Sequence, residues 1–428
     1  METLHSALGL DWINGSSLLI FLFVFLLLAD VWKNRAPKNF PPGPWALPVI
    51  GDLHQKYGNV FSLRLFGGRV VVINGYKLMR EALVDNGEDY TERPTTPAFE
   101  DYANKNKGVI GFVFFPEGKP FSVQSLINNA VSNIICCLVF GERYEYNDKQ
   151  YQSILQTLNE FVLLRRGLTF VLLPKMINFA KFKIKEHKET LDPSSPRDYI
   201  DSFLIEMGEV SEDKKSGFDS NNLCFCTLDL FMAGTETTTT TLHWGLLYMI
   251  YYPHIQGVSQ IHFQAEIDAV VGSSRQPSVS DRDNMPYTNA VIHEIQRFGD
   301  IVPVGVFHMT SKDTILNNYT IPKGTKILAS LNSVLHDESM WETPHSFNPQ
   351  HFLDQDGKFR KREAFLPFAA GKRVCLGEQL ARMELFLFFT SLLQRFSFSP
   401  APGEQPSLEF ILGATRCPKP YRLCAVPR

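Results

Sequence analysis

The chain has 428 residues, of which 44% are hydrophobic and 20% are charged. This composition predicts a folded globular protein with a large core and excludes a disordered chain. Lysine and arginine total 42 against 45 for aspartate and glutamate, so the formal net charge of −3 offers no basic field, and we expect no nucleic-acid partner. The seven cysteines are an odd number without paired CxxC spacing, which favours reduced thiols over a disulfide framework or a zinc site.

An uncharged stretch lies near the start of the chain. Residues 12–29 carry no charge and end in an unbroken apolar run, close to the roughly 20 residues that cross a bilayer. Lys33, Arg35 and Lys38 follow, and the bias of positive charge toward the cytoplasmic side of membranes predicts that the rest of the chain faces the cytosol. We therefore predict a membrane anchor over residues 1–32, with a cleaved signal peptide or a buried helix as the alternatives.

The remainder of the chain divides into a spacer and one large domain. Residues 41–44 read Pro-Pro-Gly-Pro, whose fixed φ angles and missing N–H groups favour a stiff, non-helical segment. We predict a basic and proline-rich spacer over residues 33–50 and a single domain over residues 51–428, because no linker rich in glycine, serine or like charges divides it. Residues 59–74 alternate and end in Asn-Gly, which is typical of a β-hairpin region, whereas most of residues 121–300 show a helical pattern. The predicted fold class is mainly α with a small β region.

A second long hydrophobic stretch covers residues 223–252. Asp229, Glu236 and His243 lie inside it, so we predict a buried core helix rather than a second membrane span. The stretch contains Ala-Gly-Thr-Glu-Thr followed by more threonines, a composition with poor intrinsic helix propensity. Glu236 beside Thr237 offers an acid and an alcohol for proton delivery. The alternative is an acidic residue beside threonines on a partly exposed helix face.

The most specific pattern is F-x-x-G-x-R-x-C-x-G at residues 368–377, directly before a helical stretch. A helix N-terminus lowers the pKa of a nearby thiol, so we expect Cys375 to be a thiolate and a metal ligand. Gly371 and Gly377 let the backbone approach closely, and Arg373 is a donor for a nearby anion. A lone cysteine is usually a small buried apolar side chain, and we expect that of the other six cysteines.

This pattern resembles the haem-binding loop of the cytochrome P-450 superfamily. The resemblance implies haem b (iron protoporphyrin IX) with the Cys375 thiolate as axial ligand. A single cysteine suits this ligation better than an iron–sulfur cluster, which would require several cysteines. The residues that the resemblance assigns to the cofactor are Phe368, Gly371, Arg373, Cys375, Gly377 and His308, the last as a propionate donor.

Two further segments resemble parts of the same family. The stretch Ala-Gly-Thr-Glu-Thr resembles the oxygen groove of the long central helix, with Glu236 and Thr237 as the catalytic acid and alcohol. Glu294 and Arg297 match the family's E-x-x-R, with His351 in the place of a later partner, and the three resemble the buried network that supports the cysteine loop. Without that context, a charged pair three residues apart is usually a surface salt bridge of little worth.

The resemblance is closest to subfamily J of the microsomal family-two enzymes. It rests further on the anchor, the spacer, residues 64–74 and 285–298, and the C-terminal Arg-Leu-Cys-Ala-Val-Pro. It implies a monooxygenase that receives electrons from NADPH through a reductase, with cytochrome b5 as a further partner. The implied substrates are lipophilic small molecules: polyunsaturated fatty acids such as arachidonic acid, epoxidised or hydroxylated, and xenobiotics. The implied location is the endoplasmic-reticulum membrane, with a single N-terminal anchor in lipid and a cytoplasmic catalytic domain.

The chain departs from the family pattern at several places. It looks cut after residues 51–54, after residues 113–114 and within residues 161–196, and residues 257–263 look like added material. The tryptophans lie at positions 12, 32, 45, 244 and 341, so the family's propionate-binding W-x-x-x-R is missing between positions 45 and 244. The second hypothesis is therefore a membrane-anchored, catalytically impaired variant with weak or no haem retention.

The missing helix also belongs to the basic surface that receives an acidic reductase in the family. Five basic residues near the cysteine loop remain candidates for that surface: Lys358, Arg360, Lys361, Arg362 and Lys372. The alternative is that they form an ordinary solvated charged run.

Overall fold

The computed structural model describes residues 39–42, 53–65, 68–93, 120–162, 169–210, 217–252 and 263–428. The predicted anchor over residues 1–32 and most of the predicted spacer lie outside this part of the chain. Within the described ranges, no helix combines the length and the apolar character needed to cross a membrane.

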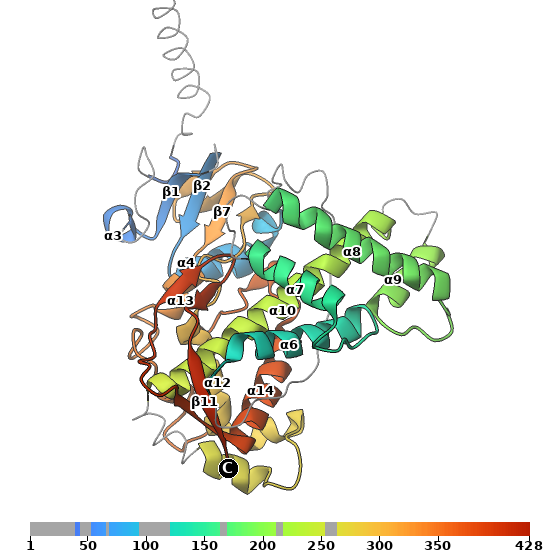
Figure 1. Cartoon of the computed structure of the whole chain (residues 1–428). Coiled ribbons are helices and arrows are strands. Elements are labelled where there is room, and N and C mark those ends of the chain that lie inside the picture. Colours follow the sequence, from blue (N-terminus) through green and yellow to red (C-terminus); the bar gives the residue numbers. More distant parts are fainter. Residues whose placement is uncertain are drawn as a thin grey trace, which may run out of the picture.

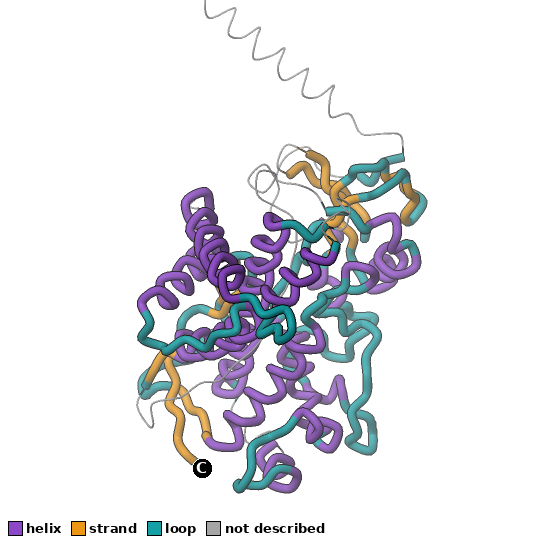
Figure 2. The backbone as a smooth tube through the Cα atoms, turned by 90° about the vertical axis from the view of Figure 1, so that its right-hand side faces the viewer, coloured by secondary structure: helices purple, strands orange, loops and turns teal. Residues whose placement is uncertain are grey.

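The described residues form a helical body with smaller groups of strands, as predicted (Figure 1). Figure 2 shows the strands gathered in separate places around the helices. The longer helices are α6 (Val123–Val139), α7 (Lys149–Val162), α8 (Thr169–Thr190), α9 (Tyr199–Glu209), α10 (Ser220–Tyr251), α12 (Pro286–Gly299) and α14 (Glu378–Arg395). The shorter helical segments are α3 (Leu53–Tyr57), α4 (Tyr76–Arg80), η1 (Glu81–Asp85), η2 (Gly87–Tyr90), η4 (Val279–Asn284), α13 (Leu331–Leu335), η5 (Pro349–Phe352) and η6 (Gly371–Arg373).

The largest sheet in the described residues has the strand order β1-β2-β7-β4. Its strands β1 (Val60–Leu65) and β2 (Gly68–Ile73) pair antiparallel, which confirms the predicted hairpin region, and β7 (Lys326–Ala329) pairs parallel with β2. The fourth strand, β4 (His308–Met309), carries a predicted site residue.

The other strands form a three-stranded sheet and two hairpins. In the three-stranded sheet, β11 (Arg422–Pro427) pairs with β3 (Phe121–Ser122) and β8 (Phe396–Pro400). The hairpins are β5 (Thr314–Leu316) with β6 (Tyr319–Ile321), and β9 (Phe410–Leu412) with β10 (Arg416–Pro418).

Helix α10 runs through the centre of the body and contacts α6, α8, α12 and α14 (Figure 1). Its N-terminus is capped by Asp219, whose carboxylate accepts the N–H groups of Asn221 and Asn222 at 2.9 Å each. At Gly245, a Cβ would lie 3.1 Å from side chains of Ile295 and Phe389, so glycine permits the close packing of α12 and α14 here. The prediction of a buried core helix is confirmed.

Several threonines of α10 fit a helix because their hydroxyls find partners, whereas the buried hydroxyls of Thr235 and Thr239 have none among the described residues. Thr227, Thr237 and Thr241 each donate to the carbonyl four residues earlier, at 2.7, 2.8 and 2.8 Å. Thr238 donates instead to Glu384 of α14 at 2.9 Å. Tertiary packing and these bonds overcome the poor helix propensity of the run.

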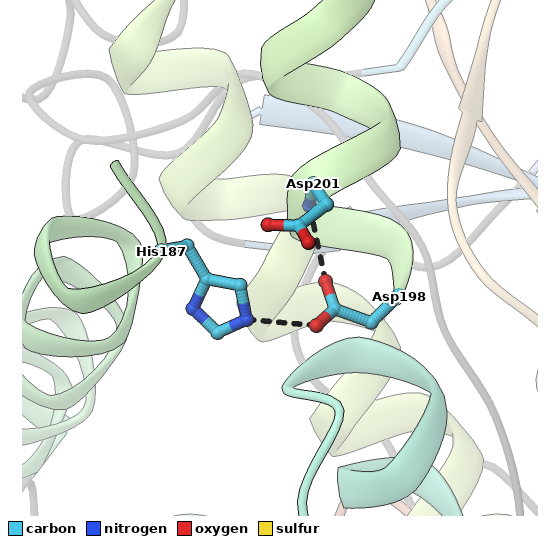
Figure 3. A group of neighbouring side chains, drawn as sticks. All are labelled: His187, Asp198 and Asp201. Atoms are coloured by element: carbon cyan, nitrogen blue, oxygen red, sulfur yellow. Dashed lines mark hydrogen bonds and ion pairs between the residues drawn. The ribbon is translucent and has the colours of Figure 1, made fainter. Parts of the chain in front are cut away.

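A buried polar junction joins α8 to the start of α9 (Figure 3). His187 Nε2 lies 2.8 Å from Asp198 Oδ2, and the other oxygen of Asp198 accepts the N–H of Asp201 at 3.0 Å. The carboxylate of Asp201 is bound by Arg197 through Nε at 2.6 Å and Nη2 at 2.9 Å. Protein donors engage both carboxylates, and Asp198 caps the N-terminus of α9.

Candidate functional site

The cysteine loop leads into α14 as predicted. Cys375 lies between η6 and α14, and its N–H donates to the carbonyl of Phe368 at 2.9 Å. Gly377 is the N-cap residue of α14 and supplies no side-chain cap, and its own N–H bonds to the Cys375 sulfur. Cys375 is exposed, which leaves its thiol accessible to a ligand.

In the protein without a metal, the pKa of the Cys375 thiol is shifted in the direction opposite to the effect of a helix N-terminus. Although Cys375 is exposed as a residue, desolvation by the protein around its sulfur raises the pKa of the thiol above its ordinary value, and the Glu378 carboxylate acts in the same direction. The N–H of Gly377 opposes this change but does not reverse it. The thiol is therefore protonated at neutral pH, and a metal ion would have to displace its proton.

The other cysteines fit the prediction of small buried side chains. Five of them are buried and Cys137 is half-buried. Cys417 on β10 has its sulfur within 3.4 Å of the Thr240 and Thr415 hydroxyls, and burial raises the pKa of its thiol to about 11. Among the seven cysteines, only Cys375 is exposed.

The two glycines of the loop serve different purposes. Gly371 has φ +76°, and a Cβ there would lie 1.7 Å from the carbonyl oxygen of Leu83, so glycine is required where the loop meets η1. Gly377 has an ordinary φ, and the nearest atom to a Cβ added there would be the Cys375 sulfur at 4.0 Å. The space beside the sulfur is thus open, a cradle that a side chain would fill.

Large aliphatic side chains are exposed on the two segments that carry Cys375 and His308. Val374 and Leu376, which flank the cysteine, are 43% and 67% exposed. Val304 and Val306, which lead into β4, are 46% and 63% exposed. Pairs of exposed apolar side chains on each of these two segments are compatible with an apolar partner that covers them.

Three basic side chains meet between the cysteine loop and β4. His308 Nδ1 lies 2.9 Å from the carbonyl of Tyr90, and Arg373 Nε donates to the next carbonyl, that of Thr91, at 2.7 Å. Arg93 donates through Nη1 to the carbonyls of the two residues before His308, at 3.0 and 2.6 Å. Sequence reasoning missed Arg93, because no motif marks it and its partners lie more than 200 residues away.

The electrostatics of these three residues favour an anionic partner. Burial and the nearby arginines lower the pKa of His308 to about 4, and burial with the charge of Arg373 lowers the pKa of Arg93 to about 10. Within the described ranges, no carboxylate forms an ion pair with His308, Arg373 or Arg93. An open cradle beside a thiol, exposed aliphatic side chains and two arginines, Arg93 and Arg373, without a carboxylate partner among the described residues together fit an apolar, carboxylate-bearing macrocycle such as haem.

Glu236 and Thr237 lie side by side on α10 but do not bond to each other. Thr237 donates to the carbonyl of Ala233 at 2.8 Å, whereas Glu236 Oε1 accepts the hydroxyls of Thr240 at 3.2 Å and Thr415 at 2.8 Å. The predicted acid and alcohol are therefore held by separate partners.

The predicted supporting network is confirmed as a buried cluster. Glu294 and Arg297 are fully buried and form two hydrogen bonds, Nη2 to Oε1 at 2.7 Å and Nε to Oε2 at 2.8 Å. Arg297 also donates to three main-chain carbonyls, of Leu335, Pro344 and Ser346, at 2.8 to 2.9 Å. His351 Nδ1 lies 3.2 Å from Glu294, so each partner of the pair is satisfied.

A separate contact links α12, the helix that carries Glu294 and Arg297, to the cysteine loop by way of α14. His293 of α12 has its Nδ1 at 2.7 Å from the carbonyl of Asn289, so its Nε2 accepts from Arg382 of α14 at 2.8 Å. The guanidinium of Arg382 lies 5.1 Å from the ring centroid of Phe368. Phe368 is therefore a packing residue of the loop, and Arg382 is a supporting residue that sequence reasoning missed.

Of the five basic candidates for a reductase surface, three are engaged by acidic residues. Arg360 and Arg362 bind Glu342 at 3.1 and 2.9 Å, and Lys372 binds Glu88. Among the described residues, no ion pair involves the remaining two, Lys358 and Lys361. Those two lysines are the part of the run available to an acidic partner.

Comparison with known proteins shows to which protein family the chain is similar. The sequence pattern described as "Cytochrome P450" matches residues 47–111 and 115–425. Human cytochrome P450 2J2 and rat cytochrome P450 2J3 are each 41% identical to the chain, over 97% and 100% of both sequences respectively. Human cytochrome P450 2D6 is 40% identical over 96% of the chain and 98% of its own length.

The comparisons also bear on the predicted cuts. The alignment with rat cytochrome P450 2J3 spans 509 positions and includes all 428 residues of the chain, so at least 81 positions hold residues that this chain lacks. The family match is interrupted between residues 111 and 115, where the sequence predicts a missing segment. The chain is thus an internally shortened relative.

The cytochrome P450 proteins are monooxygenases that use haem with a cysteine thiolate ligand and electrons from a reductase. The cysteine loop, the buried Glu294–Arg297 pair and the mainly helical fold agree with the match over nearly the whole chain. The chain belongs to the cytochrome P450 family, within microsomal family two and near subfamily J.

Proposed function

We propose that this chain is a monooxygenase of lipophilic substrates in which Cys375 holds the haem iron. The observation that carries the proposal is an exposed thiol on a loop whose arginine, Arg373, joins His308 and Arg93 in a cationic cluster without a carboxylate partner among the described residues. Haem with a cysteine thiolate ligand supplies the activation of dioxygen and the insertion of one oxygen atom into a C–H bond or an alkene.

The residues of the chain would divide the remaining tasks. Arg373, Arg93 and, when protonated, His308 would bind the propionates, each charged hydrogen bond contributing about 1.5–3 kcal/mol. Phe368 and Gly371 would fix the loop, and Gly377 would leave room beside the sulfur. Glu236 would hold an exchangeable proton at its carboxylate, and Thr237 would offer its hydroxyl close by.

The finer assignments follow from the resemblance to subfamily J. We propose polyunsaturated fatty acids, arachidonic acid among them, and xenobiotics as substrates. We further propose residues 1–32 as an anchor in the endoplasmic-reticulum membrane, residues 33–50 as a spacer and residues 51–428 as a cytoplasmic catalytic domain. Lys358 and Lys361 would contribute to docking of the reductase or of cytochrome b5.

Turnover with reductase, NADPH and arachidonic acid in reconstituted membranes tests this function. We expect oxygenated products that require NADPH and that disappear in Cys375→Ser, which removes the sulfur ligand. Cys137→Ser, a change at a half-buried cysteine of α6, is the matched control and should retain the products. Absence of NADPH-dependent products from haem-loaded wild type would contradict the proposal.

One observation favours the second candidate, a membrane-anchored variant with impaired turnover. The shortened chain lacks W-x-x-x-R between positions 45 and 244, so it lacks two propionate donors of the family. If the cluster around Arg93 does not compensate, the protein would lose haem quickly. Well-expressed wild type without bound haem would support this candidate.

A further inference from the structure

The hairpin of β9 and β10 reaches the carboxylate of Glu236. The tip of this hairpin, Gly413–Thr415, lies between two short strands far from α10 in sequence. Its Thr415 hydroxyl donates to Glu236 Oε1 at 2.8 Å, and the Cys417 thiol lies 3.4 Å from the same oxygen. The bond from Thr415 is shorter than the bond that Thr240 donates to this oxygen, which is 3.2 Å.

The position of Thr415 is fixed by main-chain bonds on both sides. The N–H of Ala414 donates to the carbonyl of Val162 at the end of α7, and the N–H of Arg416 donates to the carbonyl of Ile301, both at 2.8 Å. On α10, Trp244 Nε1 donates to the carbonyl of Arg416 at 2.7 Å. The hairpin tip therefore ties together α7, α10 and the segment that leads to His308.

The surroundings of the Thr415 hydroxyl leave Glu236 as its strongest hydrogen-bond acceptor. Thr415 is 3% exposed, so water competes little for the bond. Its other neighbour within hydrogen-bond distance is the Cys417 sulfur at 3.1 Å, a weak acceptor compared with a carboxylate. Thr237, the residue next to Glu236, makes its own bond to Ala233 and does not hold the acid.

We infer that Thr415 is a positioning residue for Glu236, so that the β9–β10 hairpin sets the orientation of the acid in proton delivery. This inference rests on the proposed function only for its effect on catalysis, because the contact itself can be measured without haem. Removal of the Thr415 hydroxyl leaves Glu236 Oε1 with the longer Thr240 bond and the weak Cys417 donor, and the carboxylate gains freedom to rotate.

The test uses Thr415→Val in the full-length chain, which keeps the shape of the side chain but removes the donor. Thr415→Ser keeps the hydroxyl and is the conservative rescue. Thr227→Val is the matched control, because Thr227 is another buried threonine, on α10, whose hydroxyl bonds to a carbonyl, that of Leu223. Thr415→Ala removes the same donor and replaces Thr415→Val in the test if that variant fails to fold.

The first readout is the infrared carboxylate stretching band of Glu236, assigned by its loss in Glu236→Gln. We expect the band to shift in Thr415→Val and to keep its position in Thr415→Ser and Thr227→Val. The second readout, on haem-loaded protein, is product formed per NADPH consumed. We expect it to fall roughly tenfold in Thr415→Val, with more hydrogen peroxide released and unchanged substrate binding.

An unchanged Glu236 band in Thr415→Val would overturn the inference, because the hydroxyl would then not hold the carboxylate. Unchanged coupling of NADPH to product in a haem-loaded Thr415→Val would overturn it as well. If wild type binds no haem, the proposed function fails, and the infrared band alone decides whether Thr415 orients Glu236.

Discussion

At the residue scale, the chemistry of the site depends on side chains whose charges are not yet balanced. Burial, together with the proximity of the arginines, lowers the pKa of Arg93 and of His308. The carbonyls of Tyr90, Thr91, Val306 and Phe307 orient the three groups but carry no full negative charge. The three side chains are therefore positioned to bind an anion. They are present although the chain lacks W-x-x-x-R, the propionate-binding motif of the family.

Replacement of Arg93 tests this role. We expect Arg93→Ala to speed the loss of haem by about ten- to one-hundredfold, because one charged hydrogen bond contributes about 1.5–3 kcal/mol. Transfer of haem to an excess of apomyoglobin measures the rate. Arg80→Ala, a change of the same kind on the exposed face of α4, is the control and should leave the rate unchanged. Equal rates for Arg93→Ala and wild type would contradict the assignment.

At the element scale, the cysteine loop is held by contacts with η1, α12 and α14. Gly371 meets the backbone of Leu83, and Arg382 bonds to His293 while it packs on Phe368. Local sequence patterns predicted the loop, the E-x-x-R pair and the β1–β2 hairpin, because each depends on residues close in the sequence. The contacts of Arg93 with Val306 and of Thr415 with Glu236 join segments 213 and 179 residues apart, so no local pattern could predict them.

The close approach at Gly371 is testable against a matched glycine. Gly357 has φ +74°, almost the same as Gly371, but a Cβ there would meet nothing within 4 Å. We expect Gly357→Ala to cost only the conformational strain of a left-handed residue, about 1–2 kcal/mol in the free energy of unfolding. Gly371→Ala should cost more and lower the haem content, because the loop must move away from Leu83. Similar haem content and stability in the two variants would contradict the steric argument.

At the scale of the whole molecule, buried neutral histidines make stability depend on pH. Burial lowers the pKa of His243 and of His293 to about 3, the latter also through the charge of Arg382. Both rings are neutral in the folded protein but titrate near their ordinary pKa of about 6.5 in the unfolded chain. Their contribution is therefore fully present above a pH of about 6.5 and is lost as the pH falls toward about 3.

The free energy of unfolding should accordingly fall by about 2 kcal/mol for each of these histidines between about pH 7 and pH 5. Urea unfolding at several pH values measures the fall. The variant His243→Phe keeps a ring beside Tyr421. In this variant the fall in the free energy of unfolding between about pH 7 and pH 5 should be smaller by about 2 kcal/mol, the contribution of one histidine. An equally steep dependence in that variant would show that His243 is not held neutral.

The proposed monooxygenase activity of this shortened chain depends on the binding of haem iron by Cys375. The most direct measurement is the absorption spectrum of the membrane-expressed protein after reduction and exposure to carbon monoxide. We expect a strongly red-shifted Soret band, the mark of a thiolate-bound ferrous haem, which disappears in Cys375→Ser and persists in Cys137→Ser. No haem band in well-expressed protein, or only the unshifted band of a displaced thiolate, would show that Cys375 does not hold haem iron in this chain.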